Sequence, residues 1–73
     1  MSPPLQKRSI ALAGHRTSLA LEAEFWAVID AAAAKRGVSL AALIAEVDEA
    51  RGEGSLASAC RLFALRQVQL GPT

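Results

Sequence analysis

The chain has 73 residues, one cysteine and a formal net charge of only +1, and 52% of its side chains are hydrophobic. One cysteine excludes an intrachain disulfide and a cysteine-based zinc site, and no apolar run approaches the ~20 residues of a membrane-spanning helix. A single domain of this size buries a modest core, so we expect a second copy of the chain to stabilise it. The lone cysteine fits a reducing compartment, and we expect a cytoplasmic protein without a membrane partner.

Residues 1–14 are predicted to form an N-terminal arm that is partly disordered. Residues 1–6 contain two prolines and no periodic pattern. Lys7–Leu12 alternates weakly between polar and apolar side chains and is either an added strand or an arm laid over a partner subunit. Gly14 permits a turn or bulge before the next element.

Charge is unevenly distributed along the chain. Residues 1–21 carry Lys7, Arg8 and Arg16 and no acid, whereas residues 22–73 carry five basic and seven acidic side chains. Basic arms bind polyanions by releasing counterions, so this pattern favours a nucleic-acid partner for the N-terminal end. The alternative interpretation is that Lys7 and Arg8 only solubilise a terminus.

The alternation continues from Arg16 to Leu21, which predicts a half-exposed strand. Leu19 and Leu21 lie on one face, and Arg16, Ser18 and Ala20 lie on the other. We expect a lone strand in this chain, and its backbone groups then need a partner strand from a second copy. The sequence therefore predicts a two-stranded ribbon shared by a dimer.

A first helix is predicted over 23–36. Its first turn is acidic, its last turn is basic, and Gly37 can adopt the left-handed conformation that ends a helix. Phe25 and Ile29 belong to the apolar stripe of its buried face, with Val28, Ala32 and Ala33. Trp26 is placed on the shoulder of that stripe, where it either packs in a dimer or anchors a partner.

Two further helices follow. Ser39 is predicted to cap the second helix, whose apolar residues recur at helical spacing before the break at Gly52-Glu53-Gly54. Ser55 is predicted to cap a third helix over 56–68, in which Cys60 is a small core residue.

The stretch from Arg16 to Val47 resembles the ribbon–helix–helix family of bacterial DNA-binding dimers typified by Arc and MetJ. The string Gly14-His15-Arg16-Thr17-Ser18 is similar to that of a subset of small stand-alone members. The other matching positions are Leu19, Leu21, Glu24, Phe25, Ile29, Ala32, Ala33, Gly37, Val38, Ser39, Leu43, Ile44 and Glu46. The resemblance implies a mainly helical fold with one short strand per chain, a ribbon–helix–helix core at 15–52, and an extra C-terminal helix and tail at 53–73.

The family's mode of binding implies a role for several residues. Two strands pair across a two-fold axis and enter the major groove, where Arg16, Ser18 and Ala20 meet base edges. Phosphates are contacted by the start of the second helix and by the basic arm, through Val38, Ser39, Leu40, Lys7 and Arg8. The implied dimer core consists of Leu19, Leu21, Phe25, Ile29, Leu43, Ile44 and Val47.

The resemblance predicts a homodimeric, sequence-specific DNA-binding protein of a bacterial transcriptional regulator type. Ala20 can offer a base only methyl contact and Ser18 is short, so Arg16 carries most of the expected base recognition. The alternative is a dimeric protein-interaction module, antitoxin-like or an adaptor, that uses residues 55–70. No catalytic constellation or set of metal ligands surrounds His15 in the sequence, and we expect neither enzymatic activity nor a cofactor.

Overall fold

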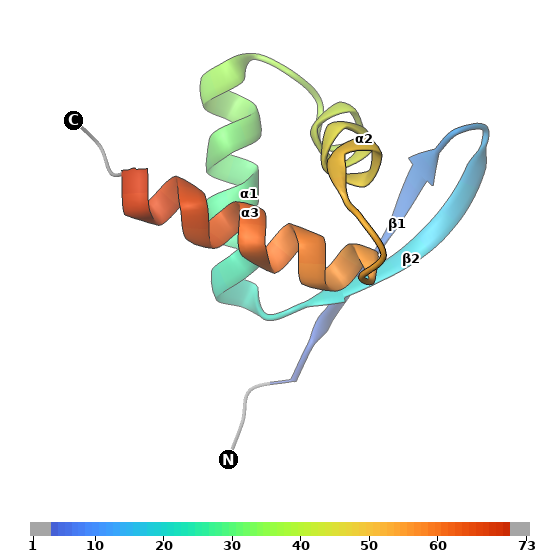
Figure 1. Ribbon diagram of the computed structural model, residues 1–73, viewed down its shortest axis with the longest axis horizontal. Coiled ribbons are helices and arrows are strands. Elements are labelled where there is room, and N and C mark those ends of the chain that lie inside the picture. The colour runs from blue at the N-terminus through green and yellow to red at the C-terminus, as the bar shows by residue number, and fades with distance from the viewer. Residues whose placement is uncertain (1–3, 71–73) are drawn as a thin grey trace.

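A computed structural model describes residues 4–70 as a β-hairpin followed by three helices (Figure 1). In chain order the elements are β1 (Gln6–Leu12), β2 (His15–Leu21), α1 (Ala23–Arg36), α2 (Leu40–Ala50) and α3 (Leu56–Leu70). The predicted combination of a two-stranded antiparallel sheet, two helices and an additional C-terminal helix is confirmed. Of the six N-terminal residues predicted to be disordered, residues 1–3 lie outside the described residues and Gln6 belongs to β1.

β2 pairs within its own chain, which corrects the prediction that this strand has no partner there. β1 and β2 are antiparallel, with Cα partners running from Gln6 and Leu21 at the open end to Leu12 and His15 at the turn. Of the two interpretations of residues 7–12, the added strand is therefore the right one. A single chain completes the sheet, so an unpaired strand no longer requires a dimer.

The turn between the strands explains why the hairpin was missed. Ala13 and Gly14 form a two-residue connection and both have positive φ, 48° and 83°. A type I′ hairpin turn requires positive φ at both central positions, for which Asn-Gly and Asp-Gly are the usual sequences. Alanine seldom adopts this conformation, so the sequence lacked the strongest hairpin signal.

The first two helices begin and end where the sequence predicts. α1 ends at Gly37, whose φ is 68° and whose N–H donates toward the carbonyl oxygens of the last turn. At the start of α2, the Ser39 side-chain oxygen accepts a hydrogen bond from the Ala42 N–H at 3.0 Å. These caps satisfy backbone groups that the helix itself leaves without partners.

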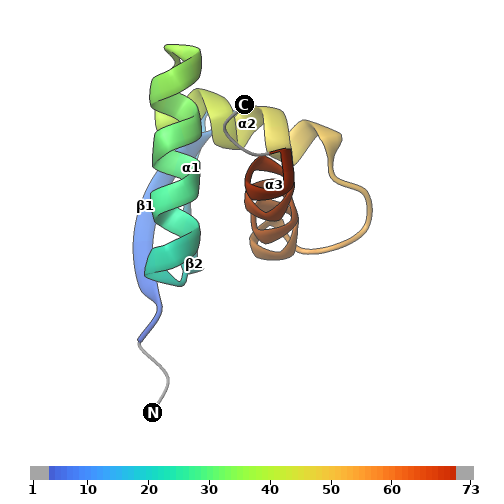
Figure 2. The same cartoon turned by 90° about the vertical axis from the view of Figure 1, so that its left-hand side faces the viewer.

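α3 packs across the body formed by α1, α2 and β2. Ser55 caps it as predicted, accepting from the Ser58 N–H at 3.1 Å, but the helix extends to Leu70 rather than ending at Val68. Figure 2 shows α3 to one side of α1, with the two strands partly behind α1. Cys60 and Ala64 fix α3 to the core, where both are buried.

The core draws on all five elements and places Trp26 differently from the prediction. Trp26 is only 1% exposed, and its Nε1 donates to the Gln6 carbonyl oxygen at 2.8 Å. Phe25, predicted to lead the buried stripe, is instead only partly buried. Trp26 is buried because it packs against β1, whose backbone also supplies the hydrogen-bond acceptor for the indole N–H.

Candidate nucleic-acid interface

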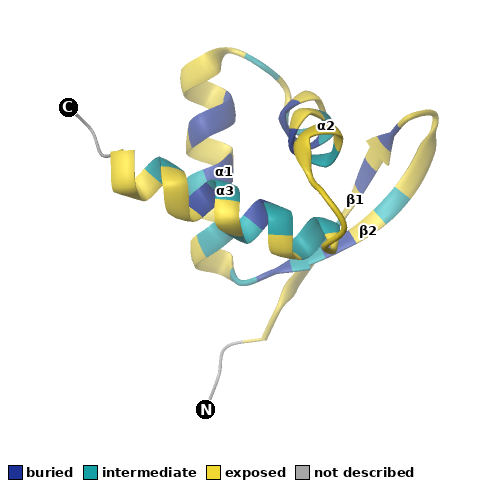
Figure 3. Cartoon of the chain, in the orientation of Figure 1, coloured by how far each residue is buried: buried dark blue, intermediate teal, exposed yellow. Residues whose placement is uncertain are grey.

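One face of the hairpin is turned away from the core. The register pairs Lys7 with Ala20, Ser9 with Ser18, and Ala11 with Arg16. Because side chains alternate between the faces of a strand, these three pairs share the face opposite to Ile10 and Leu19, which are buried. Figure 3 shows the alternation of exposed and buried positions along both strands. The outward face is thus defined as Lys7, Ser9, Ala11, Arg16, Ser18 and Ala20.

The outward face carries a cationic side chain at each end and small side chains between them. Lys7 and Arg16 are exposed and lie four residue pairs apart, which corresponds to about 13 Å along the strands. None of its six residues is acidic. Arg16 Nη1 donates to Ser9 Oγ at 3.2 Å, so the guanidinium lies across the strand pair. Short side chains between two cations let the backbone of the ribbon approach a polyanion closely.

The three residues predicted to contact bases are brought together on this face. Arg16 and Ser18 are exposed, and Ala20 is partly buried. Ser9, which is paired with Ser18 across the sheet, was not predicted as a site residue. Lys7 was predicted to lie on a separate arm, whereas its pairing with Ala20 places it on the same surface. Two alternating seven-residue runs separated by two residues were the signal for this arrangement.

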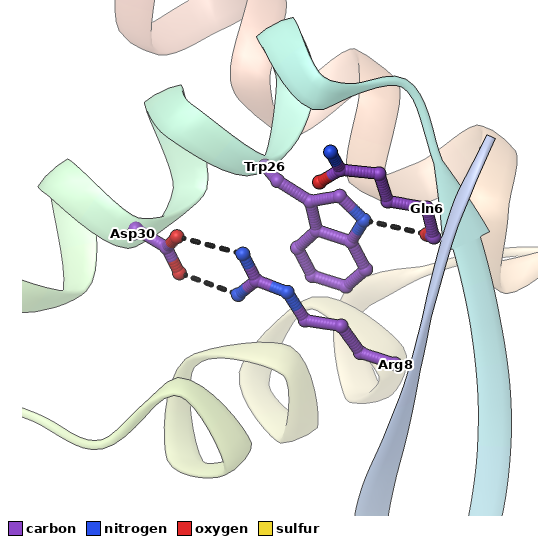
Figure 4. A network of polar contacts seen from close by, with 4 residues as sticks. All are labelled: Gln6, Arg8, Trp26 and Asp30. Carbon is purple, nitrogen blue, oxygen red and sulfur yellow. Dashed lines mark hydrogen bonds and ion pairs between the residues drawn. The ribbon is translucent and has the colours of Figure 1, made fainter. Parts of the chain in front are cut away.

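Arg8 has the opposite orientation and belongs to a polar network on the core side of β1 (Figure 4). Its Nη1 and Nη2 donate to Asp30 Oδ1 and Oδ2 at 2.9 and 3.0 Å. Its guanidinium carbon lies 4.3 Å from the centre of the Trp26 ring, a cation–π distance. The hydrogen bond to Asp30 raises the pKa of the Arg8 guanidinium. Because Arg8 is paired with Asp30 on the inner face of β1, it is not part of the outward face, and the phosphate contact predicted for it has no support from this orientation.

The predicted phosphate contacts of the second helix lie on another element. Val38, Ser39 and Leu40 form the entry to α2, where Ser39 is exposed and the other two are partly buried. Ser39 caps the Ala42 N–H, and its carbonyl oxygen accepts from the Leu43 N–H at 3.0 Å. The N–H groups of Leu40 and Ala41 precede these bonded groups, in the positions where helix starts bind anions.

The residues predicted for a dimer core are already used within one chain. All but Phe25 are buried without a second copy, with exposed fractions of at most 9% for Leu19, Leu21, Ile29, Leu43, Ile44 and Val47. Their hydrophobic burial is therefore supplied by the hairpin and the helices of one subunit. The contact between subunits that was predicted for them stays a prediction.

The described residues contain few groups suited to other chemistry. Among residues 4–70, no three or more histidine, cysteine, aspartate or glutamate side chains are grouped so that they could hold a metal ion. Burial raises the pKa of the Cys60 thiol to about 11, so this thiol is protonated near neutral pH. None of the helices in the described part of the chain is long and apolar enough to cross a membrane.

Comparison with protein families gives a match that spans most of the chain. The family model described as ribbon-helix-helix domain matches residues 5–68 and so includes both strands and nearly all of α3. Neither the curated proteins nor the solved structures provide a match.

Proposed function

Since this chain belongs to the ribbon–helix–helix family, a family of DNA-binding regulators, we propose that it is a homodimeric, sequence-specific DNA-binding protein that regulates transcription. The observation that carries the proposal is the outward face, which has a cation at each end and no acid. Phosphate backbones attract such a surface, and its narrow two-stranded shape suits a major groove about 12 Å wide.

Base recognition is assigned to side chains of both strands. Arg16 can donate two hydrogen bonds to the O6 and N7 of a guanine, which discriminates by about 1–3 kcal/mol. Ser9 and Ser18 lie between the cations and can donate to or accept from either base of a pair. Ala20 contributes apolar contact with a thymine methyl, as its side chain allows.

Phosphate contacts are assigned to Lys7 and to the start of α2. Lys7 is exposed at the open end of the hairpin, where its flexible side chain can reach the DNA backbone. Leu40 contributes its backbone N–H, with Val38 and Ser39 forming the approach to it. These contacts position the ribbon without reading sequence.

The dimer is proposed to form along the free edge of β2. In residues 4–70 each strand bonds to one other strand, so β2 has a second edge with no strand beside it. Pairing of β2 with its copy places two hairpins in one antiparallel sheet and keeps the shared ribbon typical of the family. Two outward faces then present four cations, two each of Lys7 and Arg16, to one DNA site. We place this activity in the cytoplasm of a bacterium.

The test is a titration of labelled duplex DNA at two salt concentrations with the full chain. Arg16→Ala should weaken binding and, if Arg16 also contacts phosphate, reduce the salt dependence by about two units of slope, one for each subunit of the dimer. Arg66→Gln is the matched control, because it removes an exposed cation from α3, an element to which no DNA contact is assigned. An equal loss of DNA affinity in both variants, or no loss in Arg16→Ala, would contradict the assignment of Arg16 to the DNA contact. Sedimentation equilibrium at micromolar concentration tests the dimer.

A second candidate function is a protein-interaction module built on α3. Four of the five exposed large apolar side chains in the described residues lie on this helix, namely Leu62, Leu65, Val68 and Leu70. Soluble proteins seldom group such side chains without a partner for them. An antitoxin-like protein or an adaptor would use this surface, alone or together with DNA.

Point variants test this candidate better than removal of α3, because Cys60 and Ala64 of α3 are part of the core. Leu65→Ser with Val68→Ser changes the exposed side chains and leaves the buried face intact. Affinity capture from the native cell should lose a specific partner with this double variant and retain it with Glu49→Gln, which changes an exposed side chain on α2. Recovery of the same proteins with both variants would remove the candidate.

A further inference from the structure

A groove between α2, α3 and the loop that joins them has no part in the proposed DNA interface. Its volume is about 370 Å³, within the range of sites that hold small molecules, and no residue of β1 or β2 lines it. Its apolar lining comes mainly from Leu43, Val47, Ala59, Leu62 and Phe63. Leu62 is 52% exposed and so leaves apolar surface at the rim open to solvent.

The charged groups around the groove are mostly basic. Arg36, Arg51 and Arg66 line it, whereas Glu46 is its only acid among the described residues. Glu46 already accepts a hydrogen bond from Arg36 at 2.7 Å. Arg51 donates to Asp48 Oδ1 at 2.6 Å. The positive charge without a carboxylate partner in the described residues is therefore that of Arg66.

A second positive feature lies in the same wall. Gly54, Ser55 and Ser58 line the groove at the start of α3, a helix of 15 residues. The first N–H groups of a helix carry partial positive charge, and only the Ser58 N–H is taken by the Ser55 cap. The start of α3 is separated from Arg66 by eleven residues of helix, a rise of about 16 Å, so an anion at the Arg66 end of the groove is held by Arg66 and not by the helix start.

We propose that this groove binds a small amphipathic carboxylate, with its hydrocarbon body on Val47, Leu62 and Phe63 and its carboxylate at Arg66. An arginine beside apolar surface suits this ligand, because the planar guanidinium pairs with carboxylates and its stem packs against hydrocarbon. A neutral molecule of the same shape would leave Arg66 without a partner, and a short acid would leave the apolar floor uncovered. The binding is independent of the DNA-binding proposal.

Amide chemical shifts of the full chain test the proposal directly. Sodium octanoate below its micelle concentration is the probe, and octanol and acetate separate the contributions of the hydrocarbon and the carboxylate. Octanoate should cause saturable shifts at groove residues, and octanol and acetate should each bind about tenfold or more weakly. Saturable shifts confined to other elements, or equal binding of octanoate and octanol, would overturn the proposal.

Variants then assign the carboxylate. Arg66 is exposed, so Arg66→Gln should fold normally and weaken octanoate binding by about threefold to tenfold, while leaving octanol binding unchanged. Arg66→Lys should recover part of the loss, and Lys35→Gln should have no effect. Unchanged octanoate affinity in Arg66→Gln would overturn the placement of the carboxylate.

Discussion

Arg8 and Asp30 join β1 to α1 through two parallel hydrogen bonds, and the Trp26 indole lies beneath the guanidinium (Figure 4). This arrangement fixes the hairpin against the first helix with one side chain from each. It also divides the basic residues of the N-terminal segment by role. Arg8 stabilises the fold on the inner face of β1, and Lys7 and Arg16 remain on the outer face.

The ion pair should contribute modestly to stability. The Arg8 and Asp30 side chains are 35% and 46% exposed, so solvent screens their attraction. A double-mutant cycle of Arg8→Ala and Asp30→Ala, measured by urea unfolding, should give a coupling of about 0.5–1 kcal/mol. A coupling indistinguishable from zero would mean that the network does not join the two elements energetically.

Trp26 should matter more, because it is buried and its N–H has one specific acceptor. Trp26→Phe removes the donor to the Gln6 carbonyl oxygen and part of the indole volume, which should cost about 1–3 kcal/mol. Circular dichroism during denaturant unfolding measures the change without the tryptophan signal. Phe25→Leu, at a partly buried position, serves as the comparison and should cost less.

The hairpin turn should respond in opposite directions to two substitutions. Ala13→Asn places a residue that tolerates positive φ where alanine is strained, and should stabilise the chain by about 0.5–1 kcal/mol. Gly14→Ala introduces a side chain at φ 83° and should destabilise it by about 1–2 kcal/mol. Thermal unfolding of both variants checks the signs. Stabilisation by Gly14→Ala would contradict the turn conformation.

Cys60 should make stability depend on alkaline pH. Burial raises the pKa of this thiol to about 11 from its ordinary value of 9.0, so the unfolded chain loses the proton first as pH rises. The contribution to the free energy of unfolding is therefore fully present below about pH 9 and decreases as pH rises toward 11. Cys60→Ala should lack this decrease, which urea unfolding across the pH series would reveal. If the free energy of unfolding decreased with pH equally steeply in the original chain and in Cys60→Ala, other groups would be the cause of the decrease.

Helix boundaries were predictable because their signals are local. Gly37 ends α1, and Ser39 and Ser55 cap the next two helices, so each position acts on backbone groups within a few residues. The outward positions Arg16 and Ser18 were also predictable, since strand alternation alone assigns them to one face. Family resemblance then supplied a use for that face.

The hairpin and the placement of Trp26 depended on contacts distant in sequence. Ala13 has a positive φ that alanine seldom adopts, so the sequence contained no strong signal for the turn. Because residues 7–12 were interpreted as either a strand or an arm, no acceptor for the Trp26 indole N–H could be predicted either. The orientation of Arg8 could not be predicted for a related reason, since Asp30 is 22 residues away. We expected a lone strand and therefore predicted that a partner subunit would bury the core side chains. In the structure, β1 and α3 of the same chain bury them.

Backbone amide shifts during a titration with duplex DNA test the central claim most directly. The account predicts that the largest shifts occur on the outward face at Lys7, Ser9, Arg16 and Ser18, with further shifts where α2 begins near Ser39. Shifts concentrated on α3, or spread over all surface cations alike, would contradict a hairpin that recognises DNA.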